Sequence, residues 1–564
     1  MRRRLRPRDL ASRAVSALRA RPSLTDCAFL VAAAVLSAVL YVGGLGFHGD
    51  DWGYFAELSE PQDRSLPGLV EGLYERDVPL QQRPVQLAYV ATTYFVFGLH
   101  PLGYHVVGAA MLIVIALLLY GIVRELGQRR VFAVSIALLY VLLPNYTGAR
   151  LWFGAHTAVL SVVFLVLSAY AALRALRSDR LFLPWLALGA AAVVASGMAY
   201  EVTLPVFMVV LALVVLRSSG TSAAGLRSAL GSRRVIAVIA SDVVALGFVF
   251  AFKAYVTQRV GIDEPYLEYL ARVARGTVQV NFGAYGVGIP YIVWWIAAHA
   301  PSARVFALAG VVGSVAGAYL AWLAPTVRAE LRATSARYVI AGLLVFATGY
   351  AIFLVPTLVA FESAGRENRV GTAAAIGVAI VYTGVLAGAA SLFTRLGGPR
   401  VAFGTLAGLL CAAAFVITNT QARFWVGAYE KQREIDSRIA SDVEALPHDG
   451  VLILDGVCLQ RGGAWILTGA RDLTGLLRLR HGREEIKAAA ISRPVLIDSD
   501  GIRIKAFNDV AFFPYDGNLL VYNYRRRATY RLRRQADAEA YFTSRQFRPE
   551  RDCPTVFAWG LSGG

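Results

Sequence analysis

Two adjacent carboxylates follow the first long apolar run of the chain. The run covers residues 28–46, and Asp50 and Asp51 stand in the segment Phe47-His48-Gly49-Asp50-Asp51-Trp52-Gly53-Tyr54-Phe55. Water solvates acids easily at the mouth of a membrane helix, and Trp and Tyr rings settle at the interface. The pattern predicts an acidic pair fixed at the membrane surface, where one carboxylate could act as a general base. The alternative is an Asp that only caps the next helix.

We favour Asp51 as the base, although adjacent residues cannot be ranked from sequence, and we place Trp52 beside the pair as a substrate-binding residue. His48 stands two residues before Asp50. A histidine with two carboxylates can bind a divalent cation, but so short a spacing is only a weak indication of a metal site. We therefore assign His48 to substrate binding, predict no metal ligand, and leave a divalent cation open as a cofactor.

Further polar groups stand at the ends of later apolar runs. Glu201 lies between runs 181–196 and 203–216, and a carboxylate at the membrane boundary is a functional candidate. Its alternative is an interfacial Glu solvated by water. Arg150 and His156 bracket a Trp at the end of another run, and we assign both to substrate binding. For His156 the pattern slightly favours the alternative, a packed, hydrogen-bonded core histidine.

The loop Phe361-Glu362-Ser363-Ala364-Gly365-Arg366-Glu367-Asn368-Arg369 carries cations just before an apolar run. A guanidinium offers a planar fork of donors that suits a phosphate. We predict that Arg366, Asn368 and Arg369 bind a donor phosphate. The alternative is local pairing of the two arginines with Glu362 and Glu367, which would be weak on a solvated surface.

The composition shows which elements must position these groups. The chain has 564 residues, is 57% hydrophobic and only 17% charged, whereas a soluble globule is about a quarter charged. Its formal net charge is +18. Because the arginines gather in short loops between apolar runs, membrane topology explains this charge, and no nucleic-acid partner is expected.

Eleven apolar runs are about long enough to span a bilayer. Their alternate loops are basic, as the positive-inside rule requires. This pattern predicts an integral, multi-pass protein of the inner membrane with a cytoplasmic N-terminus and an extracytoplasmic C-terminal segment. The runs are 28–46, 102–126, 131–146, 152–176, 181–196, 203–216, 235–256, 305–323, 338–358, 370–393 and 401–420.

The predicted organisation has three parts: a basic cytoplasmic N-terminus (1–23), a transmembrane catalytic domain (24–420) and a soluble extracytoplasmic domain (421–564). Residues 85–97 are expected to lie flat at the interface, and the Gly-rich segment 282–299 to be re-entrant or interfacial. In the last part, a charged helical pattern precedes short β-like runs at 451–454, 494–497 and 519–522. This pattern predicts a small α/β domain, in which Cys458 and Cys553 could pair.

Taken together, these residues resemble the membrane glycosyltransferases of the GT-C fold, and most closely the O-mannosyltransferases that carry transmembrane and TPR segments. The likeness covers residues 24–395. It rests on the acidic pair, on Arg83-Pro84, on Gly98-Leu99-His100-Pro101-Leu102-Gly103-Tyr104-His105, on Glu201 with Thr203-Leu204-Pro205, and on the position of Arg366 and Arg369. It adds Arg83 and His105 to the expected substrate-binding residues.

The resemblance implies transfer of a sugar from a polyprenyl-phosphate donor to an extracytoplasmic glycan, lipid or protein, with inversion of the anomeric centre. Membrane lipids would surround the protein as further partners. Asp50, Asp51 and Glu201 would be the catalytic residues. The chain departs from the family in two places: Tyr200 stands where the family has a Lys, and no TPR array follows.

Two other classes of function remain open. A transporter or flippase for a lipid-linked glycan would need charged residues deep in its spans and often paired halves. The sequence shows few such residues and no half-repeat. An accessory protein of cell-envelope assembly would leave the acidic pair unexplained.

Overall fold

The structure is a computed structural model of the chain. It describes residues 22–219, 223–256, 265–282, 302–326, 328–356, 361–362, 365–393, 398–443, 450–491, 495–506, 509–515, 518–547 and 552–553. The basic N-terminus and the segment expected to be re-entrant fall almost wholly outside these described residues.

Nine helices in the described ranges are long and apolar enough to cross a membrane. They are α7 (Pro101–Glu125), α10 (His156–Arg177) with η2 (Phe153–Ala155), α11 (Phe182–Ala199), η3 (Glu201–Val206) with α12 (Phe207–Ser219), α14 (Arg233–Val256), α17 (Ala303–Leu323), α18 (Arg328–Tyr350) with η5 (Ala351–Leu354), α19 (Ala374–Leu392) and α20 (Pro399–Asp442).

A tenth candidate is a broken pair, bent by 47°, of α8 (Arg130–Leu142) and the segment Pro144–Leu151, which contains η1 (Pro144–Tyr146) and α9 (Thr147–Leu151). The first apolar run forms the shorter helix α2 (Pro22–Ala38). Each of the eleven runs overlaps one of these helices. The predicted polytopic helical architecture is therefore confirmed, with nine or ten candidate spans besides α2.

Glycines let two long helices approach closely, as small residues do in membrane bundles. A Cβ added at Gly317 of α17 would lie 2.8 Å from the Gly404 carbonyl oxygen of α20, and one at Gly313 would lie 2.7 Å from that of Gly408. α18 and α19 pack in the same way, through Gly342 and Gly377 among others.

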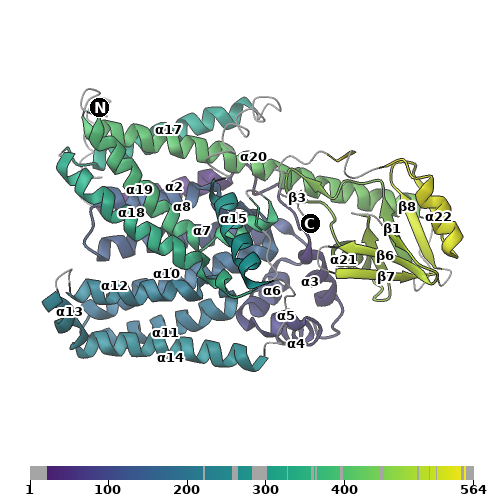
Figure 1. The fold of residues 1–564 in the computed structure, drawn as a ribbon, viewed down its shortest axis with the longest axis horizontal. Helices are drawn as coiled ribbons and strands as arrows, with labels where there is room; N and C mark the ends of the chain where they lie inside the picture. Colours follow the sequence, from purple (N-terminus) through teal and green to yellow (C-terminus); the bar gives the residue numbers. More distant parts are fainter. Residues whose placement is uncertain are drawn as a thin grey trace, which may run out of the picture.

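Short helices cover the end of the bundle at which the chain emerges from α2. They are α3 (Asp50–Ser59), α4 (Leu66–Arg76), α5 (Val78–Gln81) and α6 (Pro84–Phe97). The remaining described elements before α20 are α13 (Ala223–Leu230), α15 (Tyr266–Phe282) and η6 (Arg366–Gly371). The segment expected to lie at the interface forms α6. α3 packs against the C-terminal domain, so the acidic pair and that domain share one end of the molecule (Figure 1).

α20 joins the two parts of the molecule. Its 44 residues make it about 66 Å long at 1.5 Å per residue, roughly twice the hydrocarbon thickness of a bilayer. Figure 1 shows it running out of the bundle and along the strands. The predicted domain boundary at residue 421 therefore lies inside this helix, and the first strand begins at Val451.

The C-terminal domain is built on a four-stranded sheet of order β4-β1-β8-β9. β1 (Val451–Asp455) is parallel to both β4 (Lys487–Ala490) and β8 (Leu519–Asn523), and β9 (Ala528–Arg531) is antiparallel at the edge. The other elements are the hairpin of β2 (Gln460–Arg461) and β3 (Ala464–Trp465), the meander of β5 (Leu496–Ile497), β6 (Gly501–Ala506) and β7 (Asp509–Pro514), and the helices α21 (Ala470–His481) and α22 (Gln535–Thr543). The predicted α/β domain is confirmed.

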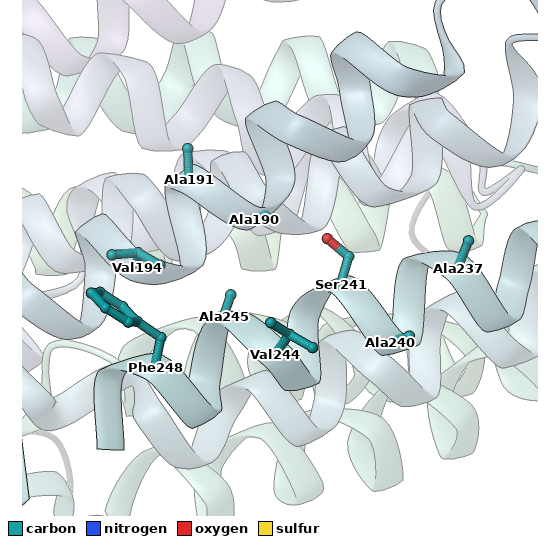
Figure 2. Close-up of a pocket in the computed structure, with 9 residues that line it drawn as sticks. All are labelled: Ala190, Ala191, Val194, Ala237, Ala240, Ser241, Val244, Ala245 and Phe248. Carbon is teal, nitrogen blue, oxygen red and sulfur yellow. The ribbon is translucent and has the colours of Figure 1, made fainter. Parts of the chain in front are cut away.

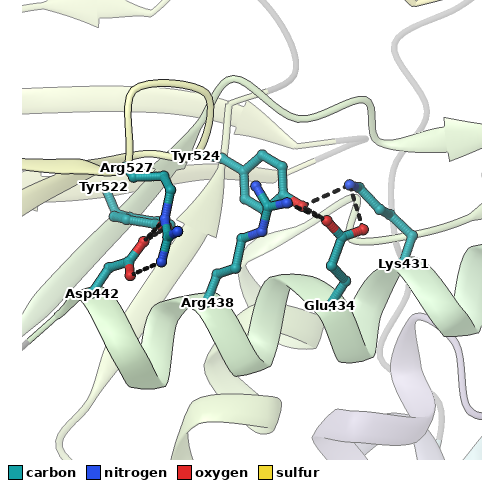
Figure 3. Close-up of polar contacts among 7 residues, drawn as sticks. All are labelled: Lys431, Glu434, Arg438, Asp442, Tyr522, Tyr524 and Arg527. Atoms are coloured by element: carbon teal, nitrogen blue, oxygen red, sulfur yellow. Dashed lines mark hydrogen bonds and ion pairs between the residues drawn. The ribbon is translucent and has the colours of Figure 1, made fainter.

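Polar contacts fasten this sheet to α20 (Figure 3). The Tyr522 hydroxyl donates to Asp442 at 2.6 Å, and Arg527 pairs with the same carboxylate at 2.7 Å. About three turns earlier on α20, Lys431 donates to the Tyr524 hydroxyl at 2.7 Å. The sheet also has two apolar faces: alternate residues of β1 belong to a core shared with the membrane helices and to a core of the domain alone.

A disulfide joins Cys458, just before β2, to Cys553 near the end of the described chain. This is the pairing that the sequence left open. The other two cysteines, Cys27 and Cys411, are free.

A separate apolar groove lies between α11 and α14 and has a volume of about 610 Å³. Figure 2 shows its small side chains, with Phe248 at one end. It is lined by Ala190, Ala191, Val194, Ala237, Ala240, Ser241, Val244, Ala245 and Phe248.

Candidate functional site

The acidic pair opens α3. Gly49 precedes the helix with a φ of +53°, a conformation that glycine adopts without strain. Asp50 and Asp51 form the first turn, where the unpaired N–H groups and the helix dipole favour negative charge. The two side chains nevertheless meet different surroundings.

Asp51 is fully buried. One carboxylate oxygen accepts from the His48 backbone N–H at 2.9 Å, and the other from the Trp152 indole N–H at 3.1 Å. Burial raises the pKa of Asp51, while these donors and the Gly154 backbone N–H act to lower it. Its oxygens hold the acidic segment against the turn at residues 152–154, which is a positioning role.

Asp50 is only half-buried. Within the described part of the chain its carboxylate makes no hydrogen bond and no ion pair, so an acceptor can reach it. It lies close enough to two arginines for its negative charge to raise their pKa. Burial lowers the pKa of both Arg369 and Arg471, and neighbouring acidic groups, Asp50 among them, reverse the shift so that both end above the usual value.

Glu201 is held by two cations from distant segments. Arg83 approaches it at 2.9–3.1 Å and Lys253 of α14 at 2.6 Å. The Arg83 guanidinium also lies 4.5 Å from the Tyr200 ring. Sequence reasoning did not connect Lys253 with Glu201, since it stands 52 residues away. Lys253 therefore places a cation beside Glu201 from another helix. The residue directly before Glu201 in the chain is Tyr200.

We call residues 365–371, which contain η6, the arginine loop. Within it, Glu367 accepts from Arg366 Nε through one oxygen and lies 3.4 Å from Arg369 through the other. The local pairing considered as the alternative is therefore present, with Glu367 as the shared partner. The Arg366 side chain is 10% exposed and that of Arg369 is 22% exposed, so Arg369 is the more accessible cation.

Asn368 is fully buried. Its side-chain oxygen accepts from the Gly148 N–H at 2.6 Å and its amide donates to the Thr147 hydroxyl at 2.8 Å. These contacts hold the arginine loop against α9, so the Asn368 side chain positions the loop.

Glu362 lies just before the arginine loop. Burial raises its pKa to about 7, and the charge of Glu367 adds to this shift, while Arg366 and Arg369 oppose it. Its protonation therefore changes near neutral pH, next to the two arginines.

Three of the histidines named from the sequence are buried. His48 donates from Nδ1 to the Trp465 carbonyl at 2.9 Å, and burial lowers its pKa to about 3, so it is neutral. His105 donates to the Gly46 carbonyl at 3.0 Å, and its ring lies 5.6 Å from that of His156. In the described ranges, no group of three or more His, Cys, Asp or Glu side chains is arranged to hold a metal ion.

Arg150 and Trp52 were both expected to bind substrate. Their side chains donate hydrogen bonds to other residues of the protein. Arg150 donates to the Val141 carbonyl at 2.7 Å and to the Tyr41 hydroxyl at 3.1 Å. The Trp52 indole donates to Gln432 of α20 at 3.2 Å. Both side chains join elements around the site, and their substrate-binding role stays a prediction.

The C-terminal domain contributes two residues that sequence reasoning missed. The Trp465 ring stacks on the Arg366 guanidinium, with 3.4 Å between the guanidinium carbon and the ring centroid. Arg471 of α21 pairs with Glu57 at 3.0 Å and with Asp77. The Gly462-Gly463 dipeptide before Ala464 was the one sequence signal of this hairpin.

The site thus combines an accessible carboxylate, an accessible arginine and an ion-paired glutamate at one end of the bundle. A carboxylate can remove a proton from a hydroxyl group. A fixed cation can stabilise a leaving phosphate as its charge develops. Asp50 and Arg369 come from segments far apart in the chain, and the fold brings them within electrostatic reach of each other.

No protein-family model matches the sequence, and no curated protein matches it. Similar solved structures include the oligosaccharyltransferase of Archaeoglobus fulgidus, tethered to an acceptor peptide containing the NVT sequon. It is 13% identical, with a TM-score of 0.38, and the match covers 78% of this chain and 62% of that chain. ArnT of Cupriavidus metallidurans, solved in the apo state and bound to undecaprenyl phosphate, is 14% identical, with a TM-score of 0.38 and coverage of 82% and 85%. Both are glycosyltransferases of the GT-C fold, and these values transfer no residue role or substrate to this chain.

Proposed function

We propose that this chain is a membrane glycosyltransferase that moves a sugar from a polyprenyl-phosphate donor to an extracytoplasmic glycan, lipid or protein. The observation that carries the proposal is the placement of the accessible Asp50 carboxylate near Arg369, at the end of a bundle of apolar helices. The residues that suggested the GT-C resemblance in the sequence gather at the same end.

The reaction needs one displacement. The acceptor hydroxyl oxygen forms a bond to the anomeric carbon while the bond from that carbon to the donor phosphate oxygen breaks. Asp50 takes the hydroxyl proton, and the electron pair of the broken bond leaves with polyprenyl phosphate. Arg369 stabilises the negative charge on that phosphate. A single displacement of this kind inverts the anomeric centre.

Glu201 takes part as an ionised group. Arg83 and Lys253 keep it charged and in place, so it can accept a hydrogen bond from a sugar hydroxyl. Arg366 and Asn368 hold the arginine loop. In this assignment the two arginines do not grip one phosphate together, because Arg366 is stacked and nearly buried.

The disulfide supports an extracytoplasmic C-terminal domain. Disulfides persist in oxidising compartments and are rare in the cytosol, and Cys458–Cys553 ties the hairpin beside the site to the end of the described chain. We propose that this domain also helps to select the acceptor.

The test is release of polyprenyl phosphate by the purified protein in lipid nanodiscs, across a panel of lipid-linked sugars with hydroxyl acceptors. We expect release with at least one donor, and we expect Arg369→Lys to weaken donor use while Arg369→Ala weakens it further, because lysine keeps the charge and loses the fork. Absence of release with every donor would overturn the proposal.

One observation favours the second candidate, a transporter of lipid-linked glycans. Asp242 lies within α14, is 3% exposed, and has an oxygen without a hydrogen-bond partner among the described residues. Buried acids inside spans are typical of transport pathways. Translocation of a labelled lipid-linked sugar across proteoliposomes, lost in Asp242→Asn and accompanied by no polyprenyl phosphate release, would establish this alternative.

A further inference from the structure

We infer that the C-terminal domain is a structural part of the site: it fixes the spacing between α3, which carries Asp50, and the arginine loop, which carries Arg369. Trp465 and Arg471 are the positioning residues. The inference rests on the proposed function for its kinetic consequences and on the contacts alone for its structural ones.

The β2–β3 hairpin holds the arginine loop. Trp465 is 6% exposed, and its ring covers the Arg366 guanidinium. The backbones of the two loops also touch: a Cβ added at Gly365 would lie 2.5 Å from the Gly463 carbonyl oxygen. No side chain larger than hydrogen fits there, so the backbones of the hairpin and the arginine loop pack in direct contact.

The same hairpin holds the acidic segment. The Trp465 carbonyl accepts the hydrogen bond from His48, and a Cβ at Gly49 would lie 3.3 Å from the Trp465 ring. Trp465 therefore lies between Gly49, which precedes Asp50, and Arg366, which pairs with the same Glu367 as Arg369. It is one bridge between the two halves of the site, and Trp152, which donates to Asp51 and whose ring lies 5.0 Å from the Arg369 guanidinium carbon, is another.

α21 holds α3 from its other side. Arg471 pairs with Glu57 of α3 and with Asp77 at the start of α5, and its guanidinium carbon lies 4.9 Å from the centroid of the Tyr54 ring. Gly475 packs directly on the backbone of Trp52, where a Cβ would collide with the Trp52 carbonyl oxygen. Four residues of membrane-domain loops and helices thus meet one face of α21.

A relay connects these contacts to the reacting groups. Trp465 fixes Arg366, Arg366 fixes Glu367, and Glu367 fixes Arg369. α21 fixes α3 and, through it, Asp50. Because a displacement of about 1 Å at a reacting centre can cost about 10²-fold in rate, loosening either contact should slow transfer even though neither residue touches the substrate.

Two variants of the full-length protein test this relay, and each has a matched control. Trp465→Ala removes the stack on Arg366, and Phe512→Ala removes a similar Arg–aromatic stack on the far sheet, where Arg503 lies 5.2 Å from the ring. Gly475→Ala forces α21 away from α3, whereas Gly469→Ala, at the start of the same helix, has no neighbouring atom closer than 3.9 Å.

We expect Trp465→Ala and Gly475→Ala to lower kcat/KM for polyprenyl phosphate release by about 10²-fold, mainly through kcat. Trp465→Phe should restore most of the rate because a flat ring still covers Arg366. Both controls should behave as wild type. Equal loss in Trp465→Phe and in the controls would mean general destabilisation of the domain and would overturn the inference.

Backbone hydrogen exchange gives a readout that needs no activity. We expect faster exchange in residues 365–371 for Trp465→Ala and in residues 50–59 for Gly475→Ala, with no change in either control. Unchanged exchange overturns the inference even if transfer is slowed. If the wild type releases no polyprenyl phosphate with any donor, the proposed function fails, and hydrogen exchange alone decides whether the domain fixes the spacing.

Discussion

Asp50 and Asp51 are neighbours in the chain, yet one is buried and the other is accessible. Successive residues on a helix point about 100° apart, so only one of the pair can face the turn at residues 152–154. Asp51 does, and its two oxygens receive hydrogen bonds there. Asp50 is only half-buried and lies within electrostatic reach of Arg369 and Arg471, which makes it our choice for the base in place of Asp51.

Asp50→Asn should lower kcat by about 10²–10⁴-fold, the usual contribution of a general base, and leave the unfolding temperature unchanged. Asp51→Asn should instead lower the unfolding temperature, because a buried donor loses its acceptor at a cost of about 1–3 kcal/mol. Turnover assays and thermal unfolding of both variants separate the two roles. Near-normal turnover in Asp50→Asn would exclude it as the base.

The charge of Glu362 should change the affinity for the donor near neutral pH. With a pKa of about 7, the group is mostly neutral below that pH and ionised above it. Ionisation adds negative charge beside Arg366 and Arg369 and weakens their attraction for a phosphate. We therefore expect the donor KM to rise a few-fold between about pH 6 and about pH 8.

Glu362→Gln should remove this rise, since glutamine stays neutral. The stability effect has the same direction: the pKa of Glu362 is higher in the folded than in the unfolded protein, so its contribution is present at low pH and is lost as the pH rises through about 7. A KM that keeps its pH dependence in Glu362→Gln would assign the effect to another group.

At the scale of elements, glycine contacts set how closely the long helices pack. Gly317→Val in α17 would press against the Gly404 backbone of α20 and should cost about 1–3 kcal/mol. Gly310→Val, on the same helix, meets nothing within 4 Å and serves as the control. Thermal unfolding in detergent measures both, and equal midpoints would show that α17 and α20 separate without cost.

α20 is the element that most changes the picture of two domains. It spans the predicted boundary without a break, and its second half carries Lys431, Glu434 and Asp442 to the sheet. A continuous helix transmits the orientation of the bundle to the C-terminal domain, because a helix has no free hinge between its turns. The domain is consequently held both by α20 and by its contacts with α3.

At the scale of the whole molecule, α3 and the C-terminal domain lie at one end of the bundle. If this end is extracytoplasmic, an impermeant maleimide should label Gln62→Cys and Ala540→Cys in intact cells, and Arg180→Cys only after permeabilisation. The background should lack the free cysteines Cys27 and Cys411. Labelling of only one of the first two, or of Arg180→Cys in intact cells, would refute the orientation.

The sequence by itself determined the helical spans, the strands at 451–454 and 519–522, and the acidic segment. These are local properties: a bilayer requires about 20 apolar residues in a row, and strand residues show in short apolar runs. Acids beside such a run stand out for the same reason.

Only the tertiary structure decided which acid is accessible, which cations hold Glu201, and that Trp465 covers Arg366. Each of these depends on a contact between segments that lie far apart in the chain. No local pattern encodes such a contact, because it forms only when helices and strands pack and bury particular side chains. The site is thus made of residues that the sequence could name in part and that packing alone could bring together.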